Sequence, residues 1–143
     1  MANTRRRFGF SLIELLIVMA IVGPLAVIVS VGWNTLLKRS RETAALAHVH
    51  TLQKAQTQFY STKRRYASSL KELENAKLIP EHLASGKLGG YLFEIVGSEE
   101  KFTIKANPER HGKTGDYSYY TDDSLVIRSN EQRVADQESA AIK

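Results

Sequence analysis

Glu14 is the residue whose surroundings most clearly demand a chemical role. It is the only charged residue between positions 10 and 37, where the chain is otherwise predominantly apolar. A carboxylate in such a segment is costly unless a cation pairs with it, and no cation lies nearby in the same helix. A cut between Gly9 and Phe10 would create a free α-amine that could serve as that cation. The alternative is that Glu14 lies at the depth of the lipid headgroups and is simply solvated.

Few other side chains have the types and spacing that catalysis or metal binding requires. Cysteine is absent, which excludes disulfides, thiol catalysis and cysteine-ligated zinc or iron–sulfur clusters. His48 and His50 stand two residues apart on a predicted helix, so they point in different directions and cannot share a metal ion. His82 and His111 are isolated in the sequence. We interpret all four histidines as solvated side chains.

Two further patterns resemble ligand sites only superficially. The run Gly112-Lys113-Thr114 ends like a phosphate loop, but Asn107 stands where that loop needs its first glycine. Four carboxylates could gather around calcium, but their spacing matches no calcium loop, and we interpret them as turn residues. These carboxylates are Glu109, Asp116, Asp122 and Asp123. Because no catalytic triad or paired-carboxylate cleft is evident, the sequence predicts no enzyme activity, no cofactor and no metal.

Basic residues cluster at positions 63–65 and 110–113, with tyrosines near both clusters in the sequence. Proteins that bind single-stranded nucleic acid interleave basic and aromatic residues in this way, so nucleic acid is kept as an alternative partner. A solvated face is the preferred interpretation. Arg5, Arg6 and Arg7 alone supply three of the net +5 charges, which leaves the rest of the chain only weakly basic.

The apolar segment at positions 10–37 is long enough to cross a membrane, since about 20 apolar residues span a bilayer as a helix. A cleaved secretory signal is the alternative. The segment exceeds the usual length of a signal core, and basic residues at 38–41 follow it rather than a small-residue cleavage site. We therefore predict a membrane span. The short leader at 1–9 is the easier end to keep in the cytoplasm, so the rest of the chain is expected outside it.

Residues 38–65 predict an amphipathic continuation of this helix, because apolar side chains recur there every three to four positions. They are Leu46, Val49, Leu52, Ala55 and Phe59. Residues 66–128 predict a small α/β head. Its strands are expected at 91–96, 101–106, 117–121 and 124–128, with hairpin turns at 97–100 and 122–123. The fold class is therefore α+β, with a long N-terminal helix packed on an antiparallel sheet of three to four strands.

Two smaller features complete the predicted head. Ser68 and Ser69 precede a short helix that contains Glu72, a pattern typical of an N-terminal cap. Glycines in the run 86–90 indicate a turn between this helical region and the first strand. Residues 129–143 are polar and lack periodicity, and we predict a frayed polar tail there.

The run Arg-Phe-Gly-Phe-Ser-Leu-Ile-Glu-Leu-Leu-Ile-Val at positions 7–18 resembles the class III signal of type IV pilins and type II secretion pseudopilins. The resemblance implies that prepilin peptidase cuts after Gly9 and methylates the new N-terminal residue, Phe10. It also implies that Glu14 of one subunit meets the Phe10 ammonium of its neighbour and sets the register of assembly. Residues 1–9 would then be a leader, and residues 10–37 the helix that forms the filament core.

Gly23 and Pro24 depart from the pattern of the family, whose members more often carry a proline where this chain has Val31. A proline inside a helix removes a backbone hydrogen bond and crowds the carbonyl four residues back, here that of Ala20. We predict a kink in the monomer. The alternative is a segment that loses helicity in the filament.

The resemblance implies a structural subunit of a type IV pilus, stored in the inner membrane and then polymerised into an extracellular helical filament. Its partners would be copies of itself, prepilin peptidase and the pilus assembly machinery. A pseudopilin of a type II secretion system, assembled in the periplasm, is the first alternative. The chain lacks the Pro-Trp-Gly stretch expected of a major pseudopilin, which favours the pilus. A membrane-anchored binding module is the second alternative, but it leaves Glu14 unexplained.

Overall fold

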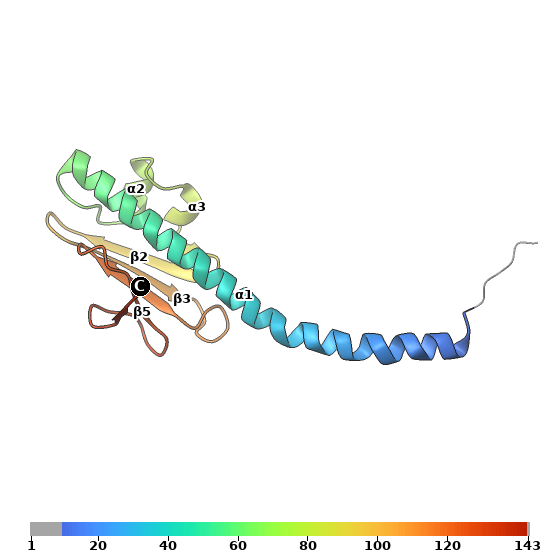
Figure 1. Cartoon of the computed structure of the whole chain (residues 1–143). Helices are drawn as coiled ribbons and strands as arrows, with labels where there is room; N and C mark the ends of the chain where they lie inside the picture. The colour runs from blue at the N-terminus through green and yellow to red at the C-terminus, as the bar shows by residue number, and fades with distance from the viewer. Residues whose placement is uncertain (1–9, 143) are drawn as a thin grey trace, which may run out of the picture. The chain divides into compact units, whose positions relative to one another are not determined.

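The computed structural model describes residues 10–142, except for the side chains of residues 26–31. The chain divides into two compact units, the first ending at Leu36 and the second beginning at Leu37. The long helix α1 (Leu12–Lys63) contributes to both units (Figure 1). We refer to the second unit as the head. The predicted leader at 1–9, including Gly9, lies outside the described residues.

The first unit consists of the amino-terminal part of α1. Ser11 precedes the helix, and its carbonyl oxygen accepts hydrogen bonds from the backbone N–H groups of Glu14 at 3.0 Å and Leu15 at 3.1 Å. The helix continues through Pro24 without a break, and the kink expected at Gly23 and Pro24 stays a prediction. Within the described part of the chain, no helix combines the length and the apolarity that crossing a membrane requires. The side chains of residues 26–31, which belong to the expected span, are not among those that the structure describes.

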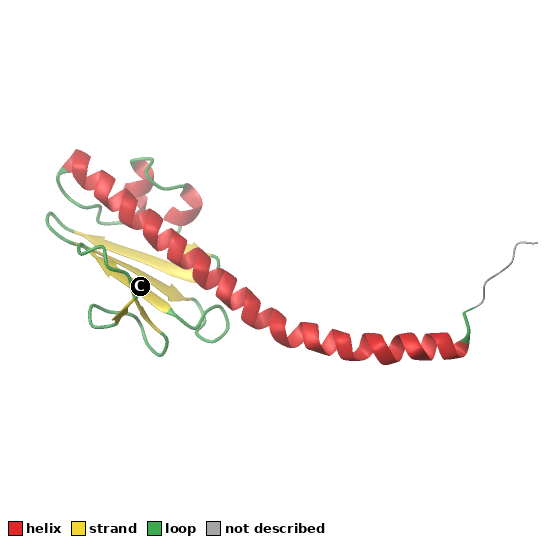
Figure 2. Ribbon diagram, viewed as in Figure 1, coloured by secondary structure: helices red, strands yellow, loops and turns green. Residues whose placement is uncertain are grey.

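The head combines the second half of α1 with two short helices, α2 (Leu70–Asn75) and α3 (Glu81–Ala84), and one antiparallel sheet (Figure 2). The predicted α+β, pilin-like class is therefore confirmed. The sheet has six strands rather than three to four, in the order of the chain. They are β1 (Lys87–Leu88), β2 (Tyr91–Gly97), β3 (Phe102–Pro108), β4 (Ser118–Asp122), β5 (Arg128–Asn130) and β6 (Ala140–Ala141).

The central hairpin of β2 and β3 defines the two ends of the head. Tyr91 pairs with Pro108 at one end of this hairpin, and Gly97 pairs with Phe102 at the other. Alternate residues of both strands are buried, as expected for a sheet covered on one face. The turn between β1 and β2 uses Gly89 and Gly90, whose φ angles of 61° and 83° favour glycine.

The carboxyl-terminal region corrects two expectations. Of the strand expected at 124–128, only Arg128 lies in a strand, because the chain turns after Asp122 and Leu125 adopts a positive φ of 61°. The described part of the expected tail, residues 129–142, is not frayed, since β6 pairs with β5 there and Ala135 is only 1% exposed. Hydrogen bonds between Ser139 and Asp136 fold this segment through a turn rather than through periodic apolar contacts. Polar side chains, rather than a pattern of apolar residues, order this segment, so the hydrophobic pattern of the sequence did not predict its structure.

The core lies between α1 and the sheet, where the helix crosses the strands in Figure 1. The predicted apolar stripe is buried at Val49, Leu52, Ala55 and Phe59, while Leu46 is half-buried. Each apolar square ångström removed from water contributes about 25 cal/mol, so this stripe is the main attachment of the helix to the sheet. The sheet contributes buried side chains from β2, β3 and β4, namely Tyr91, Phe93, Ile95, Phe102, Ile104, Ala106 and Tyr119.

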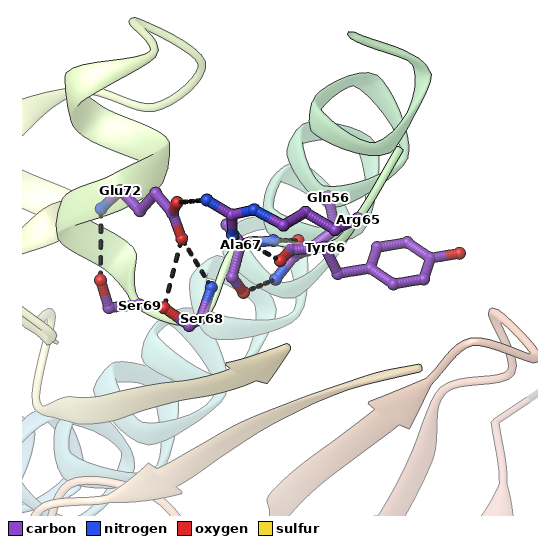
Figure 3. A network of polar contacts seen from close by, with 7 residues as sticks. All are labelled: Gln56, Arg65, Tyr66, Ala67, Ser68, Ser69 and Glu72. Carbon is purple, nitrogen blue, oxygen red and sulfur yellow. Dashed lines mark hydrogen bonds and ion pairs between the residues drawn. The ribbon is translucent and has the colours of Figure 1, made fainter. Parts of the chain in front are cut away.

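Two buried glutamines of α1 fasten the helix to the rest of the head. Gln56 is fully buried, and its amide holds both backbone groups of Ala67: the Ala67 N–H donates to Oε1 at 2.8 Å, and Nε2 donates to the Ala67 oxygen at 2.9 Å (Figure 3). Gln53 donates to the hydroxyl of Thr121 at 2.7 Å and to the carbonyl of Leu125 at 3.1 Å. Each interaction satisfies a polar group that burial would otherwise penalise.

The cap of α2 confirms the predicted short helix and shows how it begins. The hydroxyl of Ser69 accepts the Glu72 N–H at 3.3 Å, which satisfies one of the free donors of the first turn. The Glu72 carboxylate accepts the backbone N–H of Ser68 at 2.9 Å and pairs with the Arg65 guanidinium (Figure 3). The carboxylate thus reaches one residue further back than in a standard capping box and ties the end of α1 to the start of α2.

These contacts predict a measurable pH dependence. The hydrogen bond from Arg65, followed by the one from the Ser68 backbone, lowers the pKa of Glu72 from 4.5 to about 2. Because the folded-state pKa is depressed, its contribution to stability is complete above the unfolded pKa and is lost as the pH falls from there towards 2. We expect Arg65→Gln to return the Glu72 pKa towards 4.5, measured by NMR titration of its carboxyl carbon. Lys71→Gln, which removes the partner of Glu74 instead, is the control. A Glu72 pKa near 4.5 in the unmodified chain contradicts the prediction.

Candidate functional site

The amino-terminal segment presents an almost continuous apolar surface to solvent. Phe10 is 75% exposed, and large apolar side chains from the first turns of α1 are exposed with it. They are Leu12, Ile13, Leu15, Leu16, Ile17, Val18, Met19, Ile21, Val22 and Leu25. Monomeric soluble proteins rarely leave such a surface uncovered, so it marks a contact with other molecules.

Glu14 lies in the first turn of α1 and is exposed among these apolar side chains. Its carboxylate takes part in none of the ion pairs found among the described residues. The first turn of a helix carries a partial positive charge, which favours a carboxylate but does not replace a full cation. Within the described part of a single copy, the partner expected for Glu14 is therefore not supplied.

A second cluster of charged groups lies at the base of the head, which we define as the end formed by Lys38, Glu42 and the loop at 109–117. Lys38 Nζ donates to both carboxylate oxygens of Asp116, at 3.1 and 3.0 Å. Glu42 Oε1 accepts the backbone N–H of Asp116 at 2.7 Å. Two consecutive turns of α1 thus contact the same residue of the loop. The sequence analysis did not predict this contact, because its partners are more than 70 residues apart in the chain.

The loop at 109–117 is itself well ordered. The Thr114 hydroxyl donates to the carbonyl of Arg110 at 3.2 Å and accepts its N–H at 3.1 Å. Gly115 packs so closely on Tyr91 that a Cβ added to the glycine would lie 2.2 Å from the tyrosine hydroxyl oxygen. That hydroxyl donates to the carbonyl of Tyr117 at 2.8 Å. The run Gly112-Lys113-Thr114 is part of this closed loop.

The histidines and carboxylates do not assemble a metal site within the described part of the chain, where no group of three or more metal-ligating side chains comes together. His48 is not simply solvated, because it is half-buried with its ring edge-on to Phe93 at 5.8 Å. Burial, and then the nearby His82, lowers the pKa of His48. The His111 ring lies 2.6 Å from the carbonyl oxygen of Glu131.

The two basic clusters lie at opposite ends of the head. Tyr66, which follows the cluster at 63–65, donates its N–H to Ser98 in the turn after Gly97. The cluster at 110–113 follows Pro108, at the other end of the same hairpin. Seven-residue strands separate these ends by about 20 Å. The two clusters are therefore separate basic surfaces, and nucleic acid as a partner stays a prediction.

The fold and the amino-terminal segment together define a class: a pilin-like α+β subunit with an exposed apolar helix. A comparison with protein families matches residues 4–30 to the prokaryotic N-terminal methylation motif. The chain is also 41% identical over 71 residues to the type IV major pilin protein PilA of Myxococcus xanthus (strain DK1622). That match covers 50% of this chain and 32% of the relative, so it spans about a third of the relative's length. Both findings support the type IV pilin family and confirm the resemblance seen at positions 7–18.

Proposed function

We propose that the chain is the structural subunit of a type IV pilus filament. The single observation that carries this proposal is the methylation motif at 4–30 on a helix whose apolar side chains are exposed in one copy. A membrane covers that surface in the precursor, and the same surfaces of neighbouring subunits cover it in the filament. Each subunit thus exchanges one apolar environment for another, which keeps the hydrophobic cost of leaving the membrane small.

Processing creates the group that the exposed carboxylate needs. We infer that prepilin peptidase cuts between Gly9 and Phe10, and that the new amine of Phe10 is methylated and stays positively charged. In the filament, the Phe10 ammonium of one subunit pairs with Glu14 of its neighbour. A buried carboxylate is tolerated when it is paired and hydrogen-bonded, so this contact favours one axial register over its alternatives.

The head then forms the outer surface of the filament, and no enzymatic role is proposed for it. The relative in Myxococcus xanthus is described as a major pilin, which favours a major rather than a minor subunit. The remaining alternative within the same family is a pseudopilin of a type II secretion system. It has the same processing but stays in the periplasm, so the location of the processed chain separates the two.

The deciding experiment is mass spectrometry of the N-terminal peptide from filaments sheared off the cell surface. We expect a peptide that begins at N-methylated Phe10. Gly9→Val, which enlarges the residue before the cut, is the matched control and is expected to remain uncut in the membrane fraction. Processed protein found only in the membrane fraction contradicts the pilus and favours a pseudopilus. An intact terminus at Met1 or Ala2 contradicts the pilin function altogether and leaves the anchored binding module.

A further inference from the structure

Four cations at the base of the head lie on α1 and on the loop at 109–117, outside the ion pairs of the described residues. They are Arg39, Arg41, Arg110 and Lys113, which we call the basic collar. None of the ion pairs among residues 10–142 includes any of them. Arg39, Arg110 and Lys113 are exposed, and Arg41 is half-buried. Such unpaired cations are available to an external anionic partner.

The fold, not the sequence, brings the collar together. Arg39 and Arg41 belong to α1, whereas Arg110 and Lys113 belong to the loop after β3. The contacts of Asp116 with Lys38 and Glu42 hold that loop against the helix, as described above. Gly90 lies between the loop and Arg41: a Cβ added to Gly90 would lie 3.0 Å from Thr114 Cβ and 3.6 Å from Arg41 Cδ.

The carboxylates in the same region are already engaged. Asp116 pairs with Lys38 at 3.0 Å, and Glu109 pairs with Lys87 at 2.8 Å. Glu42 accepts a backbone N–H, and Glu131 also lies beside the loop, since its carbonyl oxygen is 2.6 Å from the His111 ring. Two of the acidic charges are thus neutralised locally, and the four collar cations exceed the two charges of Glu42 and Glu131. The surface they form is positive, and its partner must be negative.

The position of the collar along the chain points to a membrane surface. Arg39 follows the apolar segment at 10–37 by two residues, and Trp33, the only tryptophan in the sequence, precedes it by six. Trp33 is 57% exposed in the single chain. Tryptophan is enriched at the interface between a membrane and water, and basic residues next to a span are attracted by about 1 kcal/mol each to anionic lipid.

We propose that the basic collar binds anionic phospholipid headgroups while the subunit is stored in the membrane. The inference rests on the proposed function, because it requires that the apolar segment be inserted in a bilayer. The collar then holds the base of the head on the membrane surface, and the loop at 109–117 is the part of the head in contact with lipid. Polymerisation removes the subunit from these headgroups, so the lipid charge opposes departure from the membrane.

The test compares the full chain in vesicles of phosphatidylcholine with the full chain in vesicles of which roughly one third is phosphatidylglycerol. Trp33 fluorescence reports insertion, and hydrogen exchange followed by mass spectrometry reports protection of residues 109–117. We expect a blue shift of Trp33 in both lipids. We expect exchange in the loop to slow roughly tenfold in the anionic vesicles only, and this slowing to disappear near 1 M salt, where charges are screened within about 3 Å.

The double variant Arg110→Gln/Lys113→Gln is expected to lose the slowing and to keep the Trp33 shift. The backbone hydrogen bonds of Arg110 hold the loop closed, and this variant leaves them in place. Lys63→Gln/Lys101→Gln removes the same charge at the opposite end of the head and is expected to behave like the unmodified chain. If hydrogen exchange in the loop is equal in both lipids while the Trp33 shift is normal, binding of the collar to anionic lipid is contradicted and the proposed function is not affected. An absent Trp33 shift overturns membrane storage, and the collar with it.

Discussion

Replacing Glu14 with alanine is expected to abolish filament assembly while leaving cleavage after Gly9 intact. In the proposed filament, the variant leaves the Phe10 ammonium of each neighbour buried without a partner. Removing one member of a buried ion pair costs about 3–5 kcal/mol, and every 1.4 kcal/mol corresponds to a tenfold change in association. We therefore expect at least a hundredfold less subunit in the sheared fraction, measured by quantitative mass spectrometry.

Two further variants make the Glu14 result interpretable. Glu14→Asp keeps the charge on a shorter side chain and is expected to restore part of the assembly. Glu94→Ala removes an exposed carboxylate from β2 and is expected to assemble normally. Processed Glu14→Ala subunits in sheared filaments at the normal amount would show that this carboxylate is solvated and sets no register.

Gly97→Ala is expected to destabilise the head strongly. Its Cβ would lie 2.2 Å from the carbonyl oxygen of Ala67 and 2.8 Å from the carbonyl carbon. Ala67 cannot retreat, because Gln56 holds both its N–H and its carbonyl oxygen. Overpacking against a fixed backbone costs about 3 kcal/mol, a large part of the stability of a small domain. Urea unfolding of the full chain in detergent, followed by circular dichroism, measures the loss.

Val96→Ala is the matched control for Gly97→Ala, because Val96 is the preceding residue and its side chain is 67% exposed. Its effect is expected to stay within about 0.5 kcal/mol, as for other exposed substitutions. Equal urea midpoints for Gly97→Ala and the unmodified chain would mean that the connection between α1 and α2 moves freely.

The helix and the central strands were predictable because their signals are local. A stripe such as Val49, Leu52 and Phe59 records burial directly in the residue spacing, and β2 and β3 alternate as half-buried strands do. Residues 124–127 have the composition of a strand but stay outside one, because Asp122 builds a turn there by accepting the N–H of Ser124 at 2.9 Å. Side-chain hydrogen bonds of this kind override β-propensity. They leave no periodic pattern of apolar residues in the sequence from which they could be predicted.

The candidate sites also differ in whether their signals are local in the sequence. The segment at 7–18 is contiguous, so its residues and their spacing could be recognised without a structure. The collar required the contact of Lys38 with Asp116, 78 residues away, to bring Arg110 beside α1. Gln53 and Gln56 were missed for a related reason: in the sequence they interrupt the apolar stripe, and only the fold provides the buried polar groups that they satisfy.

The order of the sheet also bears on how the head reaches its folded state. Each strand from β2 to β6 pairs with the strand that immediately precedes it in the chain, so every pairing closes a short segment. Closing short loops costs little chain entropy, and topologies rich in local contacts fold quickly. No disulfide has to form, because the chain contains no cysteine. The sheet can therefore form by successive hairpins, and the distant contacts that the head must still close are those of α1 with the sheet and its loops.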